Sequence, residues 1–445
     1  MLDQSFSTEN FRKIFDLENR KGNYLEGDFF PELEKLSQKV QASSHALREV
    51  RRKKISYAPE KYQELKSKAK EQLEEHKSDW ENELVKQLDC VSSEVCNRNF
   101  SFGLTELDIG TSKNVFVSNK SAPAYFALKQ MQFNIRRLYK VKQSNRHQIV
   151  CQLRELLCDK LPKYIVRTDI SSFYESIPRD QILRKLRDDP LLTLQTKKLI
   201  RRVLHEYGNL TGNDTGLPRG VGISAYLAEL YMRDLDASIR NYPGVLYYAR
   251  YVDDIVVIYC PPPNVGTLKF KQLIAKSFKQ LGLKRNREKT KIYPTTPFVM
   301  TYLGYIFDVD NGLVKLRMSD TKVARYKKRI DLAFSDYATK ANAGELSARR
   351  LLEKRIDFLT GNTRLVNNKK NVVSGIYFSN SLLNDLSDLS SLDDHLKAAI
   401  SNLPNGRLKT RLQKRSFVRG FETKRYKKFS AQSLFEIVEV WKHAS

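Results

Sequence analysis

Two adjacent aspartates, Asp253 and Asp254, lie between two strongly apolar runs in the segment "LYYARYVDDIVVIYC". β-Branched and aromatic residues flank them on both sides, which predicts two short strands joined by a tight hairpin turn at Val-Asp-Asp. Aspartate is common in turns, so a single carboxylate there is explained by local hydrogen bonding. Two side by side require a cation or another specific reason.

A further carboxylate comes from the segment "KYIVRTDISSFYESI", which predicts an apolar strand that ends at Asp169, with Tyr174 five residues later. If this strand ends beside the hairpin, carboxylates from two separate segments converge. Such a pair binds two Mg²⁺ ions about 3.5–4 Å apart, one activating a 3′-hydroxyl and the other holding a triphosphate. No His/Cys set nearby competes for zinc. Asp169 as a helix N-cap is the alternative, since "SSFYESI" can begin a helix.

The elements that would position these carboxylates fall into three regions. Residues 1–105 are rich in helix formers, with Pro59 placed to start a helix. Residues 106–312 alternate helical periods with short β-branched runs, which predicts an α+β domain with an antiparallel hairpin. Residues 313–445 return to helices and basic clusters. The expected strands are "KYIVRTDI", "VLYYARY", "IVVIYC" and "FVMTYLGYIFDV"; the expected helices include "RDQILRKLRDDPLLTLQTKKLIRRVLHEYG", "ISAYLAELYMRDLDASIR" and "TLKFKQLIAKSFKQLGL".

The overall charge indicates a polyanionic partner. The 445 residues hold 78 lysines and arginines against 51 aspartates and glutamates, a net charge of +27, and an excess of this size points to nucleic acid. Residues 401–445 alone hold 11 basic residues against 3 glutamates, a local net charge of +8, interleaved with aromatics that suit base stacking. A solvated basic face is the alternative.

Several classes of protein are disfavoured by composition. No apolar run approaches the roughly 20 residues that span a bilayer, and the N-terminus lacks a secretory pattern, so we expect a cytoplasmic protein without a membrane partner. The five cysteines form no CxxC pair and have no histidine at zinc-finger spacing. We therefore expect reduced thiols and no structural zinc.

Five motifs in order, "DISSFY", "GLPRGVGISAYLAELY", "YVDD", "LKRNREKTK" and "YLGY", resemble the palm motifs of reverse transcriptases, including retron and group II intron enzymes. YxDD alone is a weak signal, but five motifs in the right order over roughly residues 133–308 are a strong one. The resemblance implies a right-hand polymerase. Its fingers and palm, with an antiparallel sheet, would occupy residues 106–312. A helical extension would precede them over residues 1–105, and a basic helical thumb and C-terminal region would occupy residues 313–445.

The resemblance also implies roles for the acidic residues and one lysine. Asp169 and Asp253 would be the pair that binds two Mg²⁺ ions, with Asp254 as a supporting carboxylate. Lys289 in "EKTK" would be the general acid for the pyrophosphate leaving group. A lysine on a solvated turn is the alternative for Lys289.

Other positions would bind the nucleotide or the primer. Tyr174 stands where reverse transcriptases keep an aromatic steric gate that leaves no room for a 2′-hydroxyl; an ordinary core tyrosine is the alternative. In "LPRGVGIS", Gly220 would let the backbone approach the nucleotide. Arg219 replaces the family's usual glutamine, which puts ordinary template handling in doubt, unless it is one more surface cation. Lys140 and Arg146 are candidates for triphosphate contact. Tyr302, Leu303 and Gly304 in "YLGY" resemble the primer grip.

The rest of the chain bears on which polymerase this is. We find no second acidic set typical of RNase H, no endonuclease signature and no zinc-finger maturase tail. The segment "RIDFLTGNTRLVNNKKNVVSGIYFSNSLL" resembles bacterial defence-associated reverse transcriptases, in particular the type-three systems with two polymerases and a noncoding RNA. That resemblance implies dNTPs, a noncoding RNA template, a DNA product, a second reverse transcriptase subunit and self-association. A retron-like or group II intron-like enzyme or maturase, and a non-catalytic RNA-binding scaffold, remain as alternatives.

Overall fold

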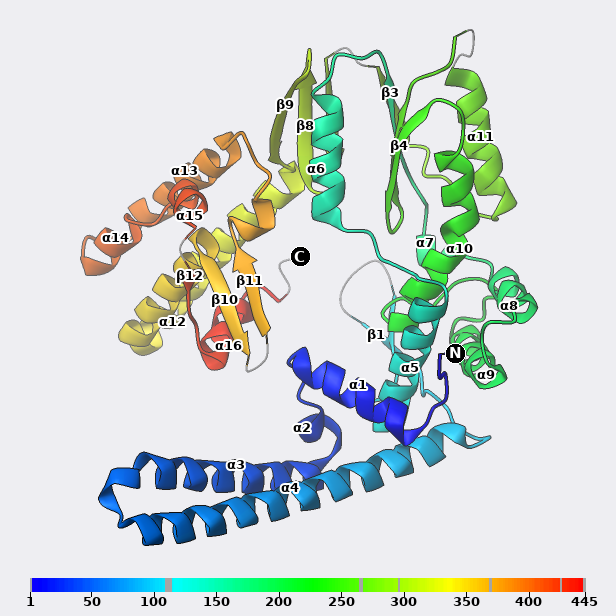
Figure 1. Ribbon diagram of the computed structural model, residues 1–445. Coiled ribbons are helices and arrows are strands. Elements are labelled where there is room, and N and C mark those ends of the chain that lie inside the picture. Colours follow the sequence, from blue (N-terminus) through cyan, green and yellow to red (C-terminus); the bar gives the residue numbers. More distant parts are fainter. Residues whose placement is uncertain are drawn as a thin grey trace. The chain divides into compact units, whose positions relative to one another are not determined.

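The computed structural model describes residues 2–108, 114–263, 267–294, 297–367, 370–424 and 426–442 (Figure 1). The chain divides into two compact units, each built from two segments: Met1–Lys142 with Ser172–Arg233, and Gln143–Ser171 with Asp234–Ser445. The division into residues 1–105, 106–312 and 313–445 stays a prediction. The predicted α+β fold with antiparallel sheets is confirmed.

The first unit is mainly helical. Two of its helices, α3 and α4, pack along each other (blue in Figure 1), and α4 begins at Pro59 as expected. The segment 179–208, expected as one helix, forms two, because a proline at 190 lacks an N–H and disfavours helix at the residue before it. The elements are α1 (Thr8–Arg20), α2 (Leu25–Phe29), α3 (Pro31–Arg52), η1 (Lys54–Ser56), α4 (Pro59–Cys96), β1 (Thr105–Leu107), β2 (Val115–Val117), α5 (Ala122–Leu138), α7 (Phe173–Ser176), α8 (Arg179–Asp188), α9 (Leu194–Thr211) and the start of α10 (Gly222–Arg240).

The second unit contains a four-stranded antiparallel sheet in the order β4-β5-β3-β6. β4 and β5 form the predicted hairpin, and β5 also pairs with β3. Alternate side chains of β5, such as Val256 and Ile258, are fully buried in one large core, which explains the apolar runs. The elements are α6 (Arg146–Leu157), β3 (Tyr164–Asp169), β4 (Val245–Tyr251), β5 (Asp254–Tyr259), α11 (Thr267–Gln280) and β6 (Lys291–Pro294).

A three-stranded antiparallel sheet follows, built from β7 (Phe298–Tyr302), β8 (Tyr305–Asp310) and β9 (Leu313–Met318). The sequence predicted a single strand over 298–309, whereas the structure has a hairpin whose turn is Leu303 and Gly304. Both turn residues have positive φ, +46° and +73°. Two consecutive residues with positive φ form the kind of turn that joins strands of natural twist, and glycine adopts it without strain.

The C-terminal part of the second unit contains a sheet that the sequence did not predict. Its order is β11-β10-β12, with β10 and β11 antiparallel and β12 parallel to β10 (orange and red in Figure 1). The elements are α12 (Asp320–Thr360), β10 (Asn362–Asn367), β11 (Lys370–Gly375), η2 (Phe378–Asn380), α13 (Ser387–Ser401), α14 (Arg407–Leu412), α15 (Phe417–Thr423), β12 (Tyr426–Lys427) and α16 (Ala431–Glu439). Among the described helices, none combines the length and the apolarity that crossing a bilayer requires.

Candidate active site

Asp169 and Asp254 lie directly opposite each other on neighbouring strands. They are the last pair in the antiparallel register of β3 and β5, which runs from Tyr164 opposite Tyr259 to Asp169 opposite Asp254. Residues opposite each other in such a pair project from the same face of the sheet. Asp169 is buried at 5% exposure. The expectation that Asp169 meets the hairpin is therefore confirmed, and Asp169 caps no helix, since the cap of α7 is Ser172.

Asp253 lies in the turn between β4 and β5. The backbone N–H of Ile170, next to Asp169, donates to the Asp253 carbonyl over 3.2 Å, so the turn is joined to the end of β3. The turn residue before it, Val252, has φ of +59°. A β-branched residue rarely adopts this conformation, and such strain is common at functional sites. The structure thus brings all three predicted aspartates to one end of the sheet.

Arg250 holds this turn in place. Its guanidinium donates to the Val252 carbonyl over 2.9 Å and forms two 2.8 Å hydrogen bonds with the carboxylate of Asp236 at the end of α10. The Arg250 side chain is only 4% exposed. A charge so deeply buried needs such a partner. The strained turn is therefore fixed by a buried ion pair.

Lys289 lies against Asp169. Its Nζ donates to Asp169 Oδ2 over 2.8 Å. Asn286 shapes the loop that carries Lys289: its N–H donates to the Asp169 carbonyl, and its side-chain oxygen accepts from the N–H of Lys289. The hydrogen bond to Asp169 raises the pKa of Lys289, and the charges of all three aspartates add to this against desolvation. Lys289 therefore lies in an exposed turn with its ammonium group held against Asp169, and its role as general acid stays a prediction.

The second cation of the site, Arg167, is the partner of Asp254. Arg167, two residues before Asp169 on the same face of β3, donates to Asp254 over 3.3 and 3.4 Å. The Tyr302 hydroxyl donates to the Asp254 carbonyl over 3.3 Å. Burial raises the pKa of Asp254; Arg167 opposes this, and the charges of Asp169 and Asp253 add to it. The negative charges of the three aspartates thus act on one another.

A divalent ion needs several ligands gathered around one point. Among the described residues, no group of three or more histidine, cysteine, aspartate or glutamate side chains is gathered closely enough to hold a metal ion. However, the three aspartates supply only hard oxygen donors, and two of them face each other across neighbouring strands. Oxygen ligands of this kind suit Mg²⁺. The donor chemistry therefore fits Mg²⁺, with Asp169, Asp253 and Asp254 as the residues that would hold it.

The predicted gate residue Tyr174 lies on α7 in the first unit, where Arg219 covers its ring. The Arg219 guanidinium lies 5.1 Å from the ring centroid and also forms two hydrogen bonds, 2.9 and 3.1 Å, with the carboxylate of Glu175. Tyr174 is half-buried, unlike its fully buried neighbour Phe173, so it is not an ordinary core residue. Arg219 is accordingly committed to a carboxylate and a ring rather than being a free surface cation.

Gly220 lies where the backbone of β2 approaches most closely. Its φ is +98°, and a Cβ on it would meet the carbonyl oxygen of Phe116 at 2.5 Å. The Phe116 N–H donates to the Arg219 carbonyl over 2.7 Å. Glycine is therefore required here for packing against β2, whether or not its backbone also approaches a nucleotide.

The other predicted positions differ in their surroundings. Arg146 donates through Nε over 2.8 Å to the Leu303 carbonyl in the β7–β8 turn and lies over the ring of Tyr305. It thus braces the turn formed by Leu303 and Gly304. Tyr302 is fully buried. Lys140 is exposed, with φ of +49°, in the first unit. The assignments of Lys140 and Arg146 to the triphosphate, and of Tyr302, Leu303 and Gly304 to the primer, stay predictions.

Three residues that support the site were not identified from the sequence: Arg167, Arg250 and Asp236. A charged residue inside a strand as apolar as "KYIVRTD" or "VLYYARY" is a signal, because such a side chain needs a partner. The partners could not be read from the sequence, since Arg167 and Asp254 are 87 residues apart.

Comparison with known proteins gives a family for the central part of the chain. Residues 117–307 match the family described as reverse transcriptase (RNA-dependent DNA polymerase). A comparison with curated proteins found no match.

Solved structures with some likeness include three polymerases. Apo telomerase from Candida tropicalis, truncated from the C-terminal domain, is 18% identical over 43% of this chain and 45% of its own, with a TM-score of 0.33. Telomerase from Candida albicans in complex with a fragment of telomeric RNA is 12% identical over 72% of this chain and 54% of its own, with a TM-score of 0.33. An RdRp complex is 9% identical over 77% of this chain and 39% of its own, with a TM-score of 0.35. The chain spans about half or less of the length of these structures, and TM-scores this low do not establish a shared fold.

Proposed function

We propose that the chain, whose residues 117–307 match the reverse transcriptase family, is an RNA-directed DNA polymerase that extends DNA from dNTPs. One observation carries the proposal: Asp169 lies opposite Asp254 in the sheet register, with Asp253 in the adjoining turn. Together with the family match, this supports a nucleotidyl transfer site in which the three aspartates have the catalytic role.

The mechanism assigns distinct tasks to the residues of the site. Asp169 and Asp253, with Asp254 beside them, would hold two Mg²⁺ ions. Bound there, the ions would lower the pKa of a primer 3′-hydroxyl and stabilise the charge of the leaving pyrophosphate. Arg167 and Lys289 offset the mutual repulsion of the carboxylates in the folded chain. Lys289 also carries a proton beside the site, so it can act as the general acid once its bond to Asp169 opens.

The choice of DNA as product follows from Tyr174. The Arg219 guanidinium lies 5.1 Å from the centroid of this half-buried ring, and an aromatic ring at this position of the motif would exclude a 2′-hydroxyl by steric overlap. We therefore expect deoxynucleotides to be preferred.

The biological setting is a further part of the proposal and rests on the resemblance of residues 355–383 to defence-associated reverse transcriptases. We propose that the template is a noncoding RNA, and that synthesis takes place in the bacterial cytoplasm as part of defence against phage. A second reverse transcriptase subunit and further copies of this chain are the expected protein partners. A retron-like or group II intron-like enzyme or maturase is the second candidate, which the same five motifs favour.

A primer-extension assay tests the catalytic proposal. Purified protein is given an RNA template, a DNA primer, Mg²⁺ and either dNTPs or NTPs. We expect incorporation of dNTPs, its loss on chelation of Mg²⁺, and its loss in Asp253→Ala with RNA affinity retained. RNA binding by the intact protein without any synthesis would instead establish a non-catalytic scaffold. Sequencing the nucleic acid that copurifies with the protein would identify the template and the product, and so test the noncoding RNA assignment.

A further inference from the structure

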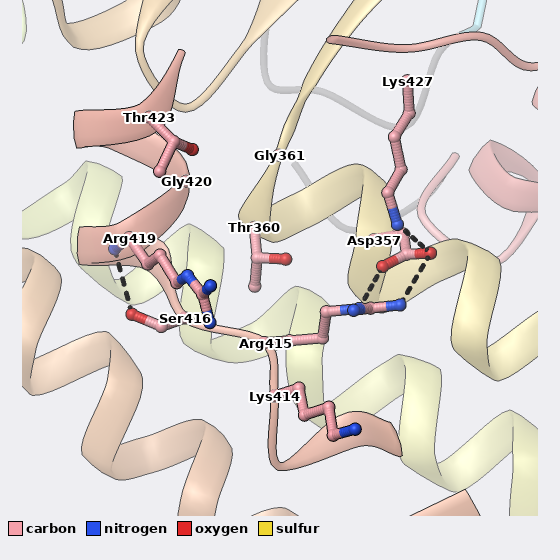
Figure 2. A pocket seen from close by; sticks show the side chains of 10 residues that line it. All are labelled: Asp357, Thr360, Gly361, Lys414, Arg415, Ser416, Arg419, Gly420, Thr423 and Lys427. Atoms are coloured by element: carbon pink, nitrogen blue, oxygen red, sulfur yellow. Dashed lines mark hydrogen bonds and ion pairs between the residues drawn. The ribbon is translucent and has the colours of Figure 1, made fainter. Parts of the chain in front are cut away.

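A basic pocket lies in the second unit, away from the aspartates in sequence, where the end of α12 meets α15, the segment before it and β12. Its volume is about 310 Å³. Four cations line it, Lys414, Arg415, Arg419 and Lys427, together with the single carboxylate of Asp357 (Figure 2). These charges leave the pocket with a net charge of +3. We call it the basic pocket.

Two of the four cations are held in place by Asp357. Arg415 forms an ion pair with one oxygen of the carboxylate and a 3.5 Å hydrogen bond with the other, and Lys427 pairs with that second oxygen. Figure 2 shows both side chains directed at Asp357. The carboxylate is only 15% exposed, whereas Arg415 and Lys427 are 34% and 44% exposed. Asp357 therefore fixes these two cations while leaving part of each at the surface.

The other two cations have no such partner. Within the described residues, no ion pair involves the side chain of Lys414 or of Arg419, and both residues are exposed. A cation without a carboxylate partner favours a bound anion, which would supply the opposite charge. Lys414 and Arg419 are thus available for a ligand.

Backbone amides do not provide the anion site. The carboxylate of Asp393 already accepts the N–H groups of Phe417 and Val418 at the start of α15, and the Ser416 hydroxyl accepts that of Arg419. An anion in the basic pocket would therefore be bound by side chains. Its backbone walls approach closely, since a Cβ on Gly420 would lie 1.7 Å from the Thr360 carbonyl oxygen. Glycine is therefore required at this position for α15 to pack against the end of α12.

The lining also indicates which anion fits. Among the residues that the structure describes, no aromatic side chain lines the basic pocket, so a nucleobase has nothing to stack on there, and the remaining lining residues are small or hydroxylic. We propose that the basic pocket binds a phosphate of a nucleic acid strand, independently of its sequence, with Lys414 and Arg419 as the main ligands. The inference rests on the proposed function only in taking nucleic acid as the partner, and it does not require catalysis.

Binding measurements without dNTPs test the inference. The probes are two single-stranded RNA 20-mers of unrelated sequence, with AMP and inorganic phosphate as competitors. Lys414→Ala combined with Arg419→Ala should weaken both RNAs equally, on the order of tenfold, and should reduce the slope of log affinity against log salt by about 1. The matched control is Lys328→Ala with Arg407→Ala, which removes two exposed cations of the same unit outside the pocket.

A variant with the opposite sign strengthens the test. Asp357→Asn removes the carboxylate from the pocket and should raise RNA affinity severalfold, whereas any general loss of structure would lower it. A thermal melt shows whether Asp357→Asn folds, and if it does not, the Lys414/Arg419 variant decides alone. An equal loss of RNA affinity in the pocket and control variants, or no loss of RNA affinity in either, would overturn the inference. Competition by AMP or phosphate that depends on Lys414 and Arg419, with RNA affinity unchanged, would assign the basic pocket to a small ligand instead.

Primer extension separates this inference from the proposed function. If the pocket variant loses RNA affinity while the intact protein shows no synthesis, the pocket stands and the polymerase proposal fails. If the intact protein synthesises DNA and the pocket variant binds RNA with unchanged affinity, the polymerase proposal stands and the pocket inference fails.

Discussion

Lys289 Nζ lies 2.8 Å from Asp169 Oδ2, across 120 residues of sequence, and so joins the loop before β6 to the end of β3. The side chain of Lys289 is 56% exposed and that of Asp169 only 8%. A cation that reaches from the surface to a buried carboxylate can serve as a counter-charge, as a proton donor, or as both in turn.

Replacing Lys289 distinguishes these roles. Lys289→Met removes both charge and proton and should lower the rate of primer extension by about a hundredfold. Lys289→Arg keeps the charge but cannot supply a proton near neutral pH, so it should restore activity only if the counter-charge is what matters. Single-turnover extension measures both. Lys284→Met, at a neighbouring exposed lysine, should have no effect. An unchanged rate in Lys289→Met would exclude both roles.

Three strands of the central sheet, β3, β4 and β5, were predictable because each is a mainly apolar run, whereas β6, with the sequence KIYP, was not predicted. Asp169 ends β3 and Asp254 begins β5, so antiparallel pairing of the two strands brings the carboxylates together. The C-terminal sheet was not predictable in the same way. β12 has only two residues, and it pairs in parallel with β10, which is over 60 residues earlier in the chain. Strands this short and this distant leave no periodic pattern in the sequence.

The supporting ion pairs were unpredictable for a related reason. Arg250 stands in an apolar strand and so needs a partner, but the sequence does not show that this partner is Asp236; only the packing of β4 against the end of α10 brings the two together. The same holds for Arg219 and Glu175, which are 44 residues apart.

The buried pair of Arg250 and Asp236 makes a prediction about stability. Arg250→Met leaves the Asp236 carboxylate without its partner and releases the Val252 carbonyl, so it should destabilise the fold by about 3–5 kcal/mol. Denaturant unfolding gives the free energy. Lys397→Met breaks an exposed pair with Asp394 and should cost no more than about 0.5 kcal/mol. Similar losses in the two variants would show that burial of the Arg250 pair is unimportant.

We expect Glu18 to make the stability of the first unit sensitive to acid. Its side chain is 4% exposed and accepts hydrogen bonds from Lys129, over 2.9 Å, and Lys21. Burial raises the pKa of Glu18, but the hydrogen bonds from Lys21 and Lys129 outweigh this and lower it from 4.5 to about 2. A lowered pKa stabilises the fold fully above about pH 4.5, where the unfolded chain is also ionised, and this stabilisation disappears as the pH falls toward 2.

Midpoints of denaturant unfolding, measured at about pH 6, 4 and 3, test this pH dependence, because these values bracket the carboxyl pKa of the unfolded chain. The intact chain should lose stability between the first and last value more steeply than Glu18→Gln, which has no carboxylate to protonate. Glu75→Gln, at an exposed position on α4, should follow the intact chain. Parallel pH profiles for Glu18→Gln and the intact chain would contradict the assignment.

The stacking of Arg219 on Tyr174 makes a prediction about sugar selection. Tyr174→Ala removes the ring and should raise the incorporation of NTPs relative to dNTPs by about ten- to a hundredfold. Arg219→Gln keeps the ring but removes the cation 5.1 Å from its centroid and the bonds to Glu175, so the ring is held less firmly and a smaller rise is expected. Glu175→Gln, which keeps one hydrogen-bonding oxygen but removes the negative charge of the ion pair, should give a rise between those of Arg219→Gln and the intact chain. The ratio of kcat/KM for dNTP and NTP on one template measures all three. If Arg219→Gln lowered kcat/KM equally for both sugars, Arg219 would act on template or triphosphate instead of positioning Tyr174.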